Sequence, residues 1–200
     1  MHGRIHDFIV INTIKNGGAY PTGNSQGAPV REFVGDWQGI EEQPTFKRVL
    51  DIGSLDINGN MYDYNYCGAG PNWRDQIGLL DFVGLDLIEG RGVNFVGNAH
   101  KMPEIWKDTF DLVMCMSMLE HDTDPQATLN EAYRVLKPGK LFLVTTVDQT
   151  HGEHKHLGGG DTETYNFITE EQFRSWLNKA GFKAIDVLHI ESDLMASCTK

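Results

Sequence analysis

The sequence predicts an α/β fold with a seven-stranded, mostly parallel sheet and helices on both of its faces. From residue 47 onward, short apolar runs alternate with segments of helical periodicity, a pattern typical of parallel sheets with crossover helices. The last two strand-like segments are separated only by Glu191 and Ser192. So short a connection predicts an antiparallel hairpin, which a plain dinucleotide-binding fold would not have at its end.

Seven segments have the length and apolar content of strands. Phe110–Met116 is apolar almost throughout, as expected of a strand that is buried on both faces. In chain order the predicted strands are Lys47–Ile52, Leu80–Leu87, Val93–Val96, Phe110–Met116, Lys140–Val147, Phe182–Ile190 and Asp193–Thr199.

Two segments between these strands carry clear helix signals. Asp124–Leu136 begins with an N-cap acid followed by proline at the first helical position, and the Lys-Pro-Gly that follows would end it. Thr169–Ala180 begins with the capping-box pair Thr169 and Gln172, and Gly181 ends it. Residues 61–73 make a poor helix because they are rich in Tyr, Gly and Asn.

Residues 1–46 are predicted to form an appendage on the domain of residues 47–200. Residues 7–15 fit a short helix or a strand, and residues 16–29 have the Gly, Pro and Asn content of a loop. Residues 31–40 place apolar side chains on one helical face. The appendage is therefore either a lid or a simple N-terminal cover.

Composition narrows the classes of substrate. The chain has 17 basic and 28 acidic residues, a net charge of −11, and no cluster of Lys and Arg of the kind that a nucleic-acid backbone requires. A small molecule, or a group on a glycan or protein, fits this charge better. No apolar run approaches the roughly 18 residues of a membrane span, and the first residues do not resemble a signal peptide. The three cysteines are far apart and odd in number, which favours reduced thiols and a cytoplasmic protein.

The stretch RVLDIGSLDINGN, residues 48–60, has the local form of a nucleotide-binding turn. Gly53 lets the backbone bend sharply after an apolar strand. Asp51 and Asp56 place carboxylates beside this bend, and a carboxylate repels phosphate. The expected ligand is therefore cationic, or presents hydroxyls and an amine. A buried strand followed by a tight turn without a ligand is the alternative.

Two further polar groups follow the next two predicted strands. Asp86 closes strand two and is placed to accept hydrogen bonds from two ribose hydroxyls. Residues 97–100 follow strand three, where the Asn98 amide and a backbone N–H can meet an adenine edge. Because ligands of open α/β sheets bind at the carboxyl ends of the strands, these groups are expected to share one site with the strand-one turn.

The ordered motifs VLDIGS, FVGLDL, VGNAHKMP, FDLVMCMSMLEH and LNEAYRVLKPGKLFLVTT, with the closing hairpin, resemble those of class I S-adenosylmethionine-dependent methyltransferases. Within this class the chain is most similar to the type 11 methyltransferase domains, over residues 47–199. The resemblance implies a Rossmann-like fold and S-adenosyl-L-methionine as the cofactor. The cofactor carries a sulfonium and an ammonium group, so acids near it agree with its chemistry.

The resemblance also implies which residues hold the cofactor. The strand-one turn would lie against the methionine part, the acid after strand two would hold the ribose, and the loop after strand three would face the adenine. The end of strand four would offer its backbone near the methionine amine. Together with their neighbours these residues are Asp51, Gly53, Ser54, Asp86, Leu87, Asn98, Ala99, Cys115 and Met116.

The chain departs from the family pattern at two places. Of the three spaced glycines that usually follow the strand-one acid only Gly53 is present, with Leu55 and Ile57 at the other two positions. Asn98 stands where the family usually has an acid that faces the adenine. A GSLDING-type turn is similar to that of some methyltransferases of glycan gene clusters, so it marks a subfamily.

Methyl transfer is an in-line displacement at carbon, and an oxygen nucleophile benefits from a base. Two candidates for a catalytic base are His121, in the Glu120-His121 pair after strand four, and His154, in the loop after strand five. His121 is equally compatible with a structural role. The loop of residues 148–161 is read as solvated and without a metal, although its histidines would suit one. Tyr165 and Phe167 are expected to pack against the last helix.

Three functions are consistent with this pattern to different degrees. The leading one is a methyltransferase that acts on a hydroxyl or amine of a small molecule or a sugar. The alternative is an S-adenosylmethionine-binding protein without transferase activity that serves as a partner or regulator. A nicotinamide-dependent oxidoreductase is disfavoured, because the chain lacks the G-x-G-x-x-G motif and ends in a hairpin.

Overall fold

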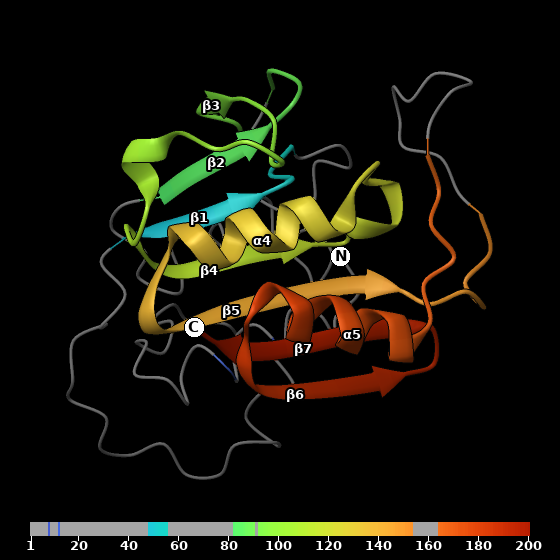
Figure 1. Ribbon diagram of the computed structural model, residues 1–200. Helices are drawn as coiled ribbons and strands as arrows, with labels where there is room; N and C mark the ends of the chain where they lie inside the picture. The colour runs from blue at the N-terminus through green and yellow to red at the C-terminus, as the bar shows by residue number, and fades with distance from the viewer. Residues whose placement is uncertain (1–7, 9–11, 13–47, 56–81, 91, 154–163) are drawn as a thin grey trace, which may run out of the picture.

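The computed structural model describes residues 8, 12, 48–55, 82–90, 92–153 and 164–200. Seven strands form one sheet in the order β3-β2-β1-β4-β5-β7-β6 (Figure 1). The five strands from β3 to β5 pair in parallel, and β7 pairs antiparallel with both β5 and β6. The predicted mostly parallel sheet with a C-terminal hairpin is confirmed. The strands are β1 (Val49–Ile52), β2 (Phe82–Asp86), β3 (Phe95–Val96), β4 (Phe110–Met116), β5 (Leu136–Val147), β6 (Lys183–Ile190) and β7 (Asp193–Thr199).

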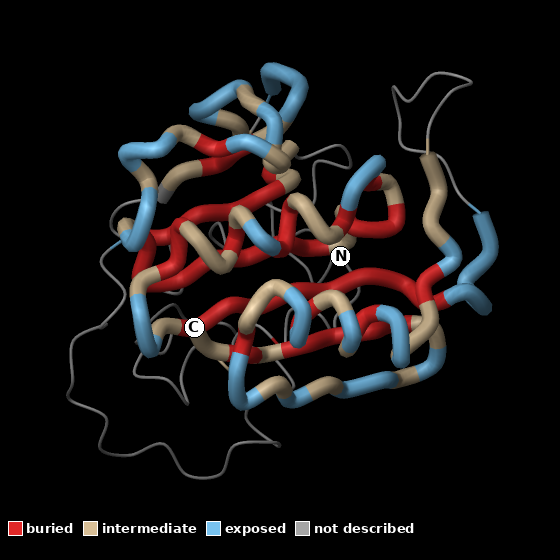
Figure 2. The backbone as a smooth tube through the Cα atoms, viewed as in Figure 1, coloured by how far each residue is buried: buried red, intermediate tan, exposed pale blue. Residues whose placement is uncertain are grey.

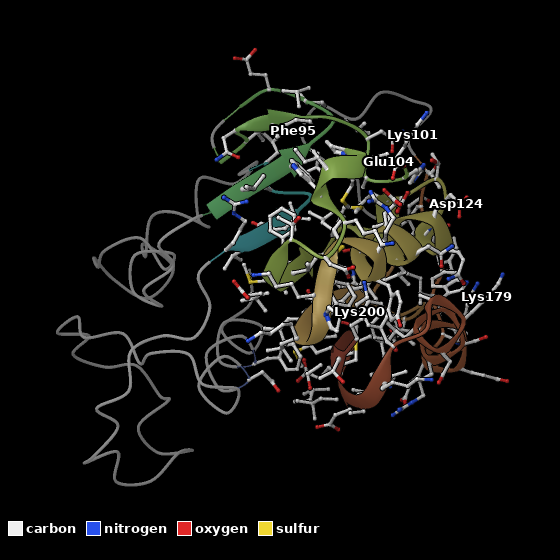
Figure 3. The ribbon with its side chains drawn as sticks, turned by 60° about the vertical axis from the view of Figure 1, so that its left-hand side comes forward. Phe95, Lys101, Glu104, Asp124, Lys179 and Lys200 are labelled. Atoms are coloured by element: carbon white, nitrogen blue, oxygen red, sulfur yellow. The ribbon has the colours of Figure 1, made fainter. Side chains whose placement is uncertain are left out.

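The core lies around the central strands, as Figure 2 shows. Every residue of β1 and of β4 is buried, which confirms that the apolar run of β4 is covered on both faces. Phe142 of β5 stacks on Phe182 with the ring centroids 4.7 Å apart. The two edge strands are more exposed: Phe95 lies on β3 beside the segment that carries Glu104 (Figure 3), and its ring contacts Trp106.

Two helices, α4 (Pro125–Val135) and α5 (Glu170–Ala180), lie over the same face of the sheet (Figure 1). The predicted caps are confirmed: the Asp124 carboxylate accepts from the backbone N–H of Ala127 at 3.0 Å, and the Thr169 hydroxyl accepts from that of Gln172 at 3.1 Å. Gly181 ends α5 in the left-handed region, with φ 105°. These signals are local, which explains why the sequence revealed them.

The start of β5 differs from the prediction. The strand begins at Leu136 and not at Lys140, because Leu136 pairs with Phe110 of β4 directly after α4 ends. The ladder is then irregular up to Leu112, and Gly139 adopts φ 71°. The Lys-Pro-Gly sequence therefore ends the helix by entering an irregular strand, and α4 stops one residue before the predicted Leu136.

Two short 3-10 helices, η2 (Glu104–Trp106) and η3 (Leu119–His121), follow β3 and β4. Of the N-terminal segment, Phe8 and Asn12 are described: both are helical, and the Asn12 amide donates to the Phe8 carbonyl at 2.8 Å. The remaining predictions for residues 1–46 and for residues 61–73 lie outside the described residues. Within the described part, no helix is long and apolar enough to cross a membrane.

Candidate active site

The turn after β1 bends towards β2 at Gly53. The backbone N–H groups of Gly53 and Ser54 both donate to the carbonyl of Leu85, at 2.9 and 3.1 Å. Gly53 has φ 73°, and a Cβ at this position would lie 2.7 Å from Cγ of Met118. Both the backbone angle and the contact with Met118 therefore require glycine here.

Asp86, at the end of β2, is joined to this turn. One of its carboxylate oxygens accepts from the backbone N–H of Leu55 at 3.0 Å, and the other accepts from that of Ile88 at 3.2 Å. A carboxylate has about four acceptor positions, so each oxygen keeps capacity for a further hydroxyl donor. Asp86 thus also fastens the β1 turn, a role that the sequence analysis did not identify.

Leu55, which replaces a family glycine, has a specific partner. A Cβ at Gly90, in the loop after β2, would lie 2.4 Å from Cδ1 of Leu55. The space for the leucine is therefore provided by a glycine 35 positions further along the chain. This contact explains how the turn tolerates the departure from the three-glycine pattern.

The loop after β3 lies at the same edge of the sheet. The Asn98 side-chain oxygen accepts from the backbone N–H of His100 at 2.8 Å, and Ala99 packs against the core. The His100 ring, through Nε2, is hydrogen-bonded to the Asp122 carboxylate at 2.5 Å. The orientation of the Asn98 side chain is therefore fixed by a hydrogen bond within its own loop, and His100 connects this loop to the segment after β4.

The other predicted cofactor residues differ in exposure. Asp51 and Ser54 are fully buried, whereas Leu87 is 67% exposed beside Asp86. Cys115 pairs with both neighbouring strands, but Met116 lies one residue past the last β1 pair, Ile52 with Cys115. Burial raises the pKa of the Cys115 thiol well above its usual value, so this cysteine is inert.

Glu120, on η3, is a buried acid at this edge with a raised pKa. The Glu120 side chain is buried, and one carboxylate oxygen accepts a hydrogen bond of 2.7 Å from the Thr146 hydroxyl of β5. Burial raises the pKa of Glu120 to about 7, against the smaller lowering effect of its hydrogen bonds. The sequence placed Glu120 beside the cofactor but did not reveal its burial.

Of the two histidines proposed as catalytic bases, the structure describes only His121. His121 is half-buried, and its ring packs against Tyr165 with the centroids 5.5 Å apart. His154 lies outside the described residues. Phe167 is 56% exposed and its ring contacts that of Tyr165. Of residues 164–169, Ile168 is the buried one.

Among the described residues, no group of His, Cys, Asp and Glu could hold a metal ion.

Comparison with known proteins decides the family. A family model described as "Methyltransferase domain" matches residues 31–187. The chain belongs to this methyltransferase family. The predicted class, an S-adenosylmethionine-dependent methyltransferase of class I, is confirmed. A ubiquinone biosynthesis O-methyltransferase of Pseudomonas putida (strain F1) is 28% identical over 161 residues, 71% of this chain and 67% of that protein.

Solved structures show the same fold. An S-adenosylmethionine-dependent methyltransferase from Mesorhizobium loti has a TM-score of 0.53 and 17% identity, covering 76% of this chain and 90% of that one. A structure described as the [4+2]-cyclase SpnF has a TM-score of 0.62 and 15% identity, covering 99% of this chain and 81% of that one. The fold is therefore shared by a methyltransferase and by a protein described as a cyclase.

The groups at the sheet edge fit the cofactor of this methyltransferase. The Asp86 carboxylate has acceptor capacity for hydroxyls, whereas the space that a Cβ of Gly53 would enter is taken by the Met118 side chain. The neighbouring acids suit a ligand with sulfonium and ammonium groups. The residues and the cofactor therefore agree in their chemistry, and the residues lie at one edge of the sheet.

Proposed function

We propose that this methyltransferase transfers the methyl group of S-adenosyl-L-methionine to a hydroxyl or amine of a small molecule or a sugar-type group. One observation carries the proposal: Asp86 at the end of β2 and the segments after β1, β3 and β4 are linked by hydrogen bonds at one edge, the backbone N–H of Gly97 donating to the Asp86 carbonyl at 2.8 Å. Leu55 is bonded to Asp86, and His100 is bonded to Asp122. The O-methyltransferase name of the Pseudomonas relatives supports a hydroxyl acceptor.

In this proposal Asp86 accepts from the ribose hydroxyls, and Leu87 with the Asn98–Ala99 turn lies against the adenine. Gly53 and Ser54 lie along the methionine part, where the backbone comes close to the ligand. Asp51 acts through its charge and not by contact, because it is fully buried. Met116 is better placed than Cys115 to offer a backbone group, because only Met116 lies beyond the end of β1.

When bound, the cofactor supplies an electrophilic methyl group on sulfur. The acceptor gives up a proton when it takes the methyl group, and a base of this chain would receive that proton. His121 is proposed as this base because its ring is half-buried, whereas Glu120 is buried.

Two observations favour a second candidate, a cofactor-binding protein without transferase activity. Leu55 and Asn98 stand at positions where the family has glycine and an acid, and SpnF, described as a cyclase, has the same fold. Such a protein would bind S-adenosylmethionine but would not release its methyl group.

Titration calorimetry with S-adenosylmethionine and S-adenosylhomocysteine is the first test, and absence of binding at millimolar cofactor would end both candidates. Release of S-adenosylhomocysteine is then measured with catechol, caffeic acid, glucosamine and rhamnose as probe acceptors. Turnover that falls in His121→Ala but not in the exposed His151→Ala supports the transferase. Cofactor binding without turnover of any probe favours the second candidate.

A further inference from the structure

Asn166 donates three hydrogen bonds to backbone carbonyls of η3 and of the residue that follows it. Its backbone N–H donates to the carbonyl of Glu120 at 2.6 Å. Its side-chain amide donates to the carbonyl of Leu119 at 2.9 Å and to that of Asp122 at 2.6 Å. One residue of the segment after β5 therefore binds three carbonyls of the segment after β4.

The Leu119 carbonyl also accepts from the backbone N–H of Asp122, so it is the carbonyls of Glu120 and Asp122 for which the bonds from Asn166 matter most. A helical turn leaves its last carbonyls without partners inside the helix, and buried carbonyls without a hydrogen bond are costly. Within η3 the backbone supplies few bonds, such as those from His121 to Met118 and from Asp122 to Leu119. The position of η3 thus depends on a residue more than 40 positions away.

The segment that carries Asn166 is itself attached to the end of β5. The backbone N–H of Gln149 donates to the Ile168 carbonyl at 2.9 Å, and Asp148 forms a parallel bridge with Ile168. The Tyr165 hydroxyl donates to the Gly152 carbonyl at 2.8 Å. Both ends of the chain that follows β5 are therefore fastened beside η3.

The acid that η3 buries is Glu120. Its carboxylate is bonded to Thr146 of β5 and lies in the field of Asp193, the first residue of β7. It in turn acts on the Tyr165 phenol and, with other buried acids, on the Cys115 thiol. Any movement of η3 would admit water to this carboxyl.

We propose that Asn166 is a positioning residue for the methyl-transfer site: it holds η3 so that Glu120 stays buried against Thr146 and His121 stays against Tyr165. The chain after β5 and the site after β4 are thereby coupled. The importance of this coupling for catalysis rests on the proposed function, but the coupling itself does not.

The test uses Asn166→Ala and, as a matched control, Asn178→Ala. Asn178 also donates its side-chain amide to a backbone carbonyl, that of Arg174 at 2.8 Å, but on the exposed side of α5. Glutamate labelled with ¹³C at its carboxyl carbon reports the Glu120 titration by NMR in the full chain, and Glu120→Gln assigns the signal. We expect the Glu120 titration to move down by about one pH unit or more in Asn166→Ala, because water then reaches the carboxyl. No movement is expected in Asn178→Ala.

An unchanged Glu120 titration in folded Asn166→Ala, or an equal change in both variants, would overturn the inference. If Asn166→Ala does not fold, Asn166→Ser replaces it, since the shorter hydroxyl cannot reach both carbonyls. Calorimetry with S-adenosylhomocysteine on the unmodified chain is a separate measurement. If binding is absent while the titration shifts as expected, the proposed function fails and the positioning role of Asn166 stands.

Discussion

The Thr146 hydroxyl donates a hydrogen bond of 2.7 Å to the buried carboxyl of Glu120, and so joins the end of β5 to η3. This is a bond between two polar groups that are both almost fully covered. A hydrogen bond offsets only part of the cost of burying a carboxylate, so the protonated acid is favoured. Burial at this edge of the sheet therefore raises the pKa of Glu120 to about 7.

The first prediction concerns the stability of Glu120→Gln. The pKa of Glu120 is about 7 in the fold against an ordinary value of 4.5, so folding takes up a proton between these pH values. The free energy of unfolding of the unmodified chain should therefore fall as the pH rises through this range, by an amount on the order of 3 kcal/mol. Glu120→Gln should lack this fall and be the more stable form at pH 8. Urea unfolding at several pH values measures the free energy of unfolding of each form, and Glu89→Gln, at an exposed position, is the control. Equal slopes in the unmodified chain and Glu120→Gln would contradict the prediction.

The second prediction concerns His189 on β6. Its Nε2 lies 2.8 Å from the Asp148 carboxylate and its Nδ1 lies 3.1 Å from that of Glu170, which also pairs with Arg174. Burial lowers the pKa of His189, but the two carboxylates outweigh it and raise the pKa. The stabilisation is then present at low pH and lost as the pH rises through the folded-state pKa.

His189→Gln should accordingly lower the melting temperature more at pH 6 than at pH 9. Thermal unfolding at the two pH values measures the difference. His151→Gln, at an exposed histidine of the segment after β5, is measured beside it as the comparison variant. A loss that is the same at both pH values would show that the ring acts without its charge.

The third prediction compares two glycines. A Cβ at Gly84 of β2 would lie 1.9 Å from the carbonyl oxygen of Gly92, and backbone cannot move away cheaply. Gly84→Ala should therefore cost several kcal/mol, on the order of the whole margin of stability. At Gly139 a Cβ would meet nothing within 4 Å, and only its φ of 71° opposes alanine. Gly139→Ala should cost about 1 kcal/mol. Denaturant unfolding of both variants measures the loss of stability in each. Equal losses in Gly84→Ala and Gly139→Ala would contradict the prediction.

The fourth prediction concerns the cofactor and depends on the proposed role of Asp86. Asp86→Asn keeps an oxygen for the Leu55 N–H but loses the charge that strengthens bonds from the ribose hydroxyls. The Kd for S-adenosylhomocysteine should rise by roughly tenfold to a hundredfold, as for a charged hydrogen bond of about 1.5–3 kcal/mol. Calorimetry measures it, with Asp186→Asn, at an exposed position of β6, as the control. An unchanged Kd would remove Asp86 from the site.

Several features of the fold could be predicted because their causes are local. The apolar run of β4, the caps at Asp124 and Thr169, and the two-residue link before β7 each express a preference of a few adjacent residues. The acid that closes β2 and the glycine after β1 mark the edge of the sheet where ligands bind, because parallel strands end together. The ordered motifs by themselves also indicate the methyltransferase class.

The features that the sequence did not reveal depend on contacts between distant positions. Gly90 makes room for Leu55, Asp86 fastens the turn after β1, and Thr146 with Asn166 holds the segment that carries Glu120. The early start of β5 and the exposure of Phe167 also depend on how distant segments pack.

By itself, then, the sequence determined the order of strands and helices, the class of enzyme and the edge of the sheet where its polar groups gather. Only the tertiary structure decided which of those groups are buried, which are bonded to one another, and at what pH Glu120 changes its charge. The physical reason is that periodicity and capping are properties of neighbouring residues, whereas burial and hydrogen-bond partners are set by segments that meet only once the sheet has formed.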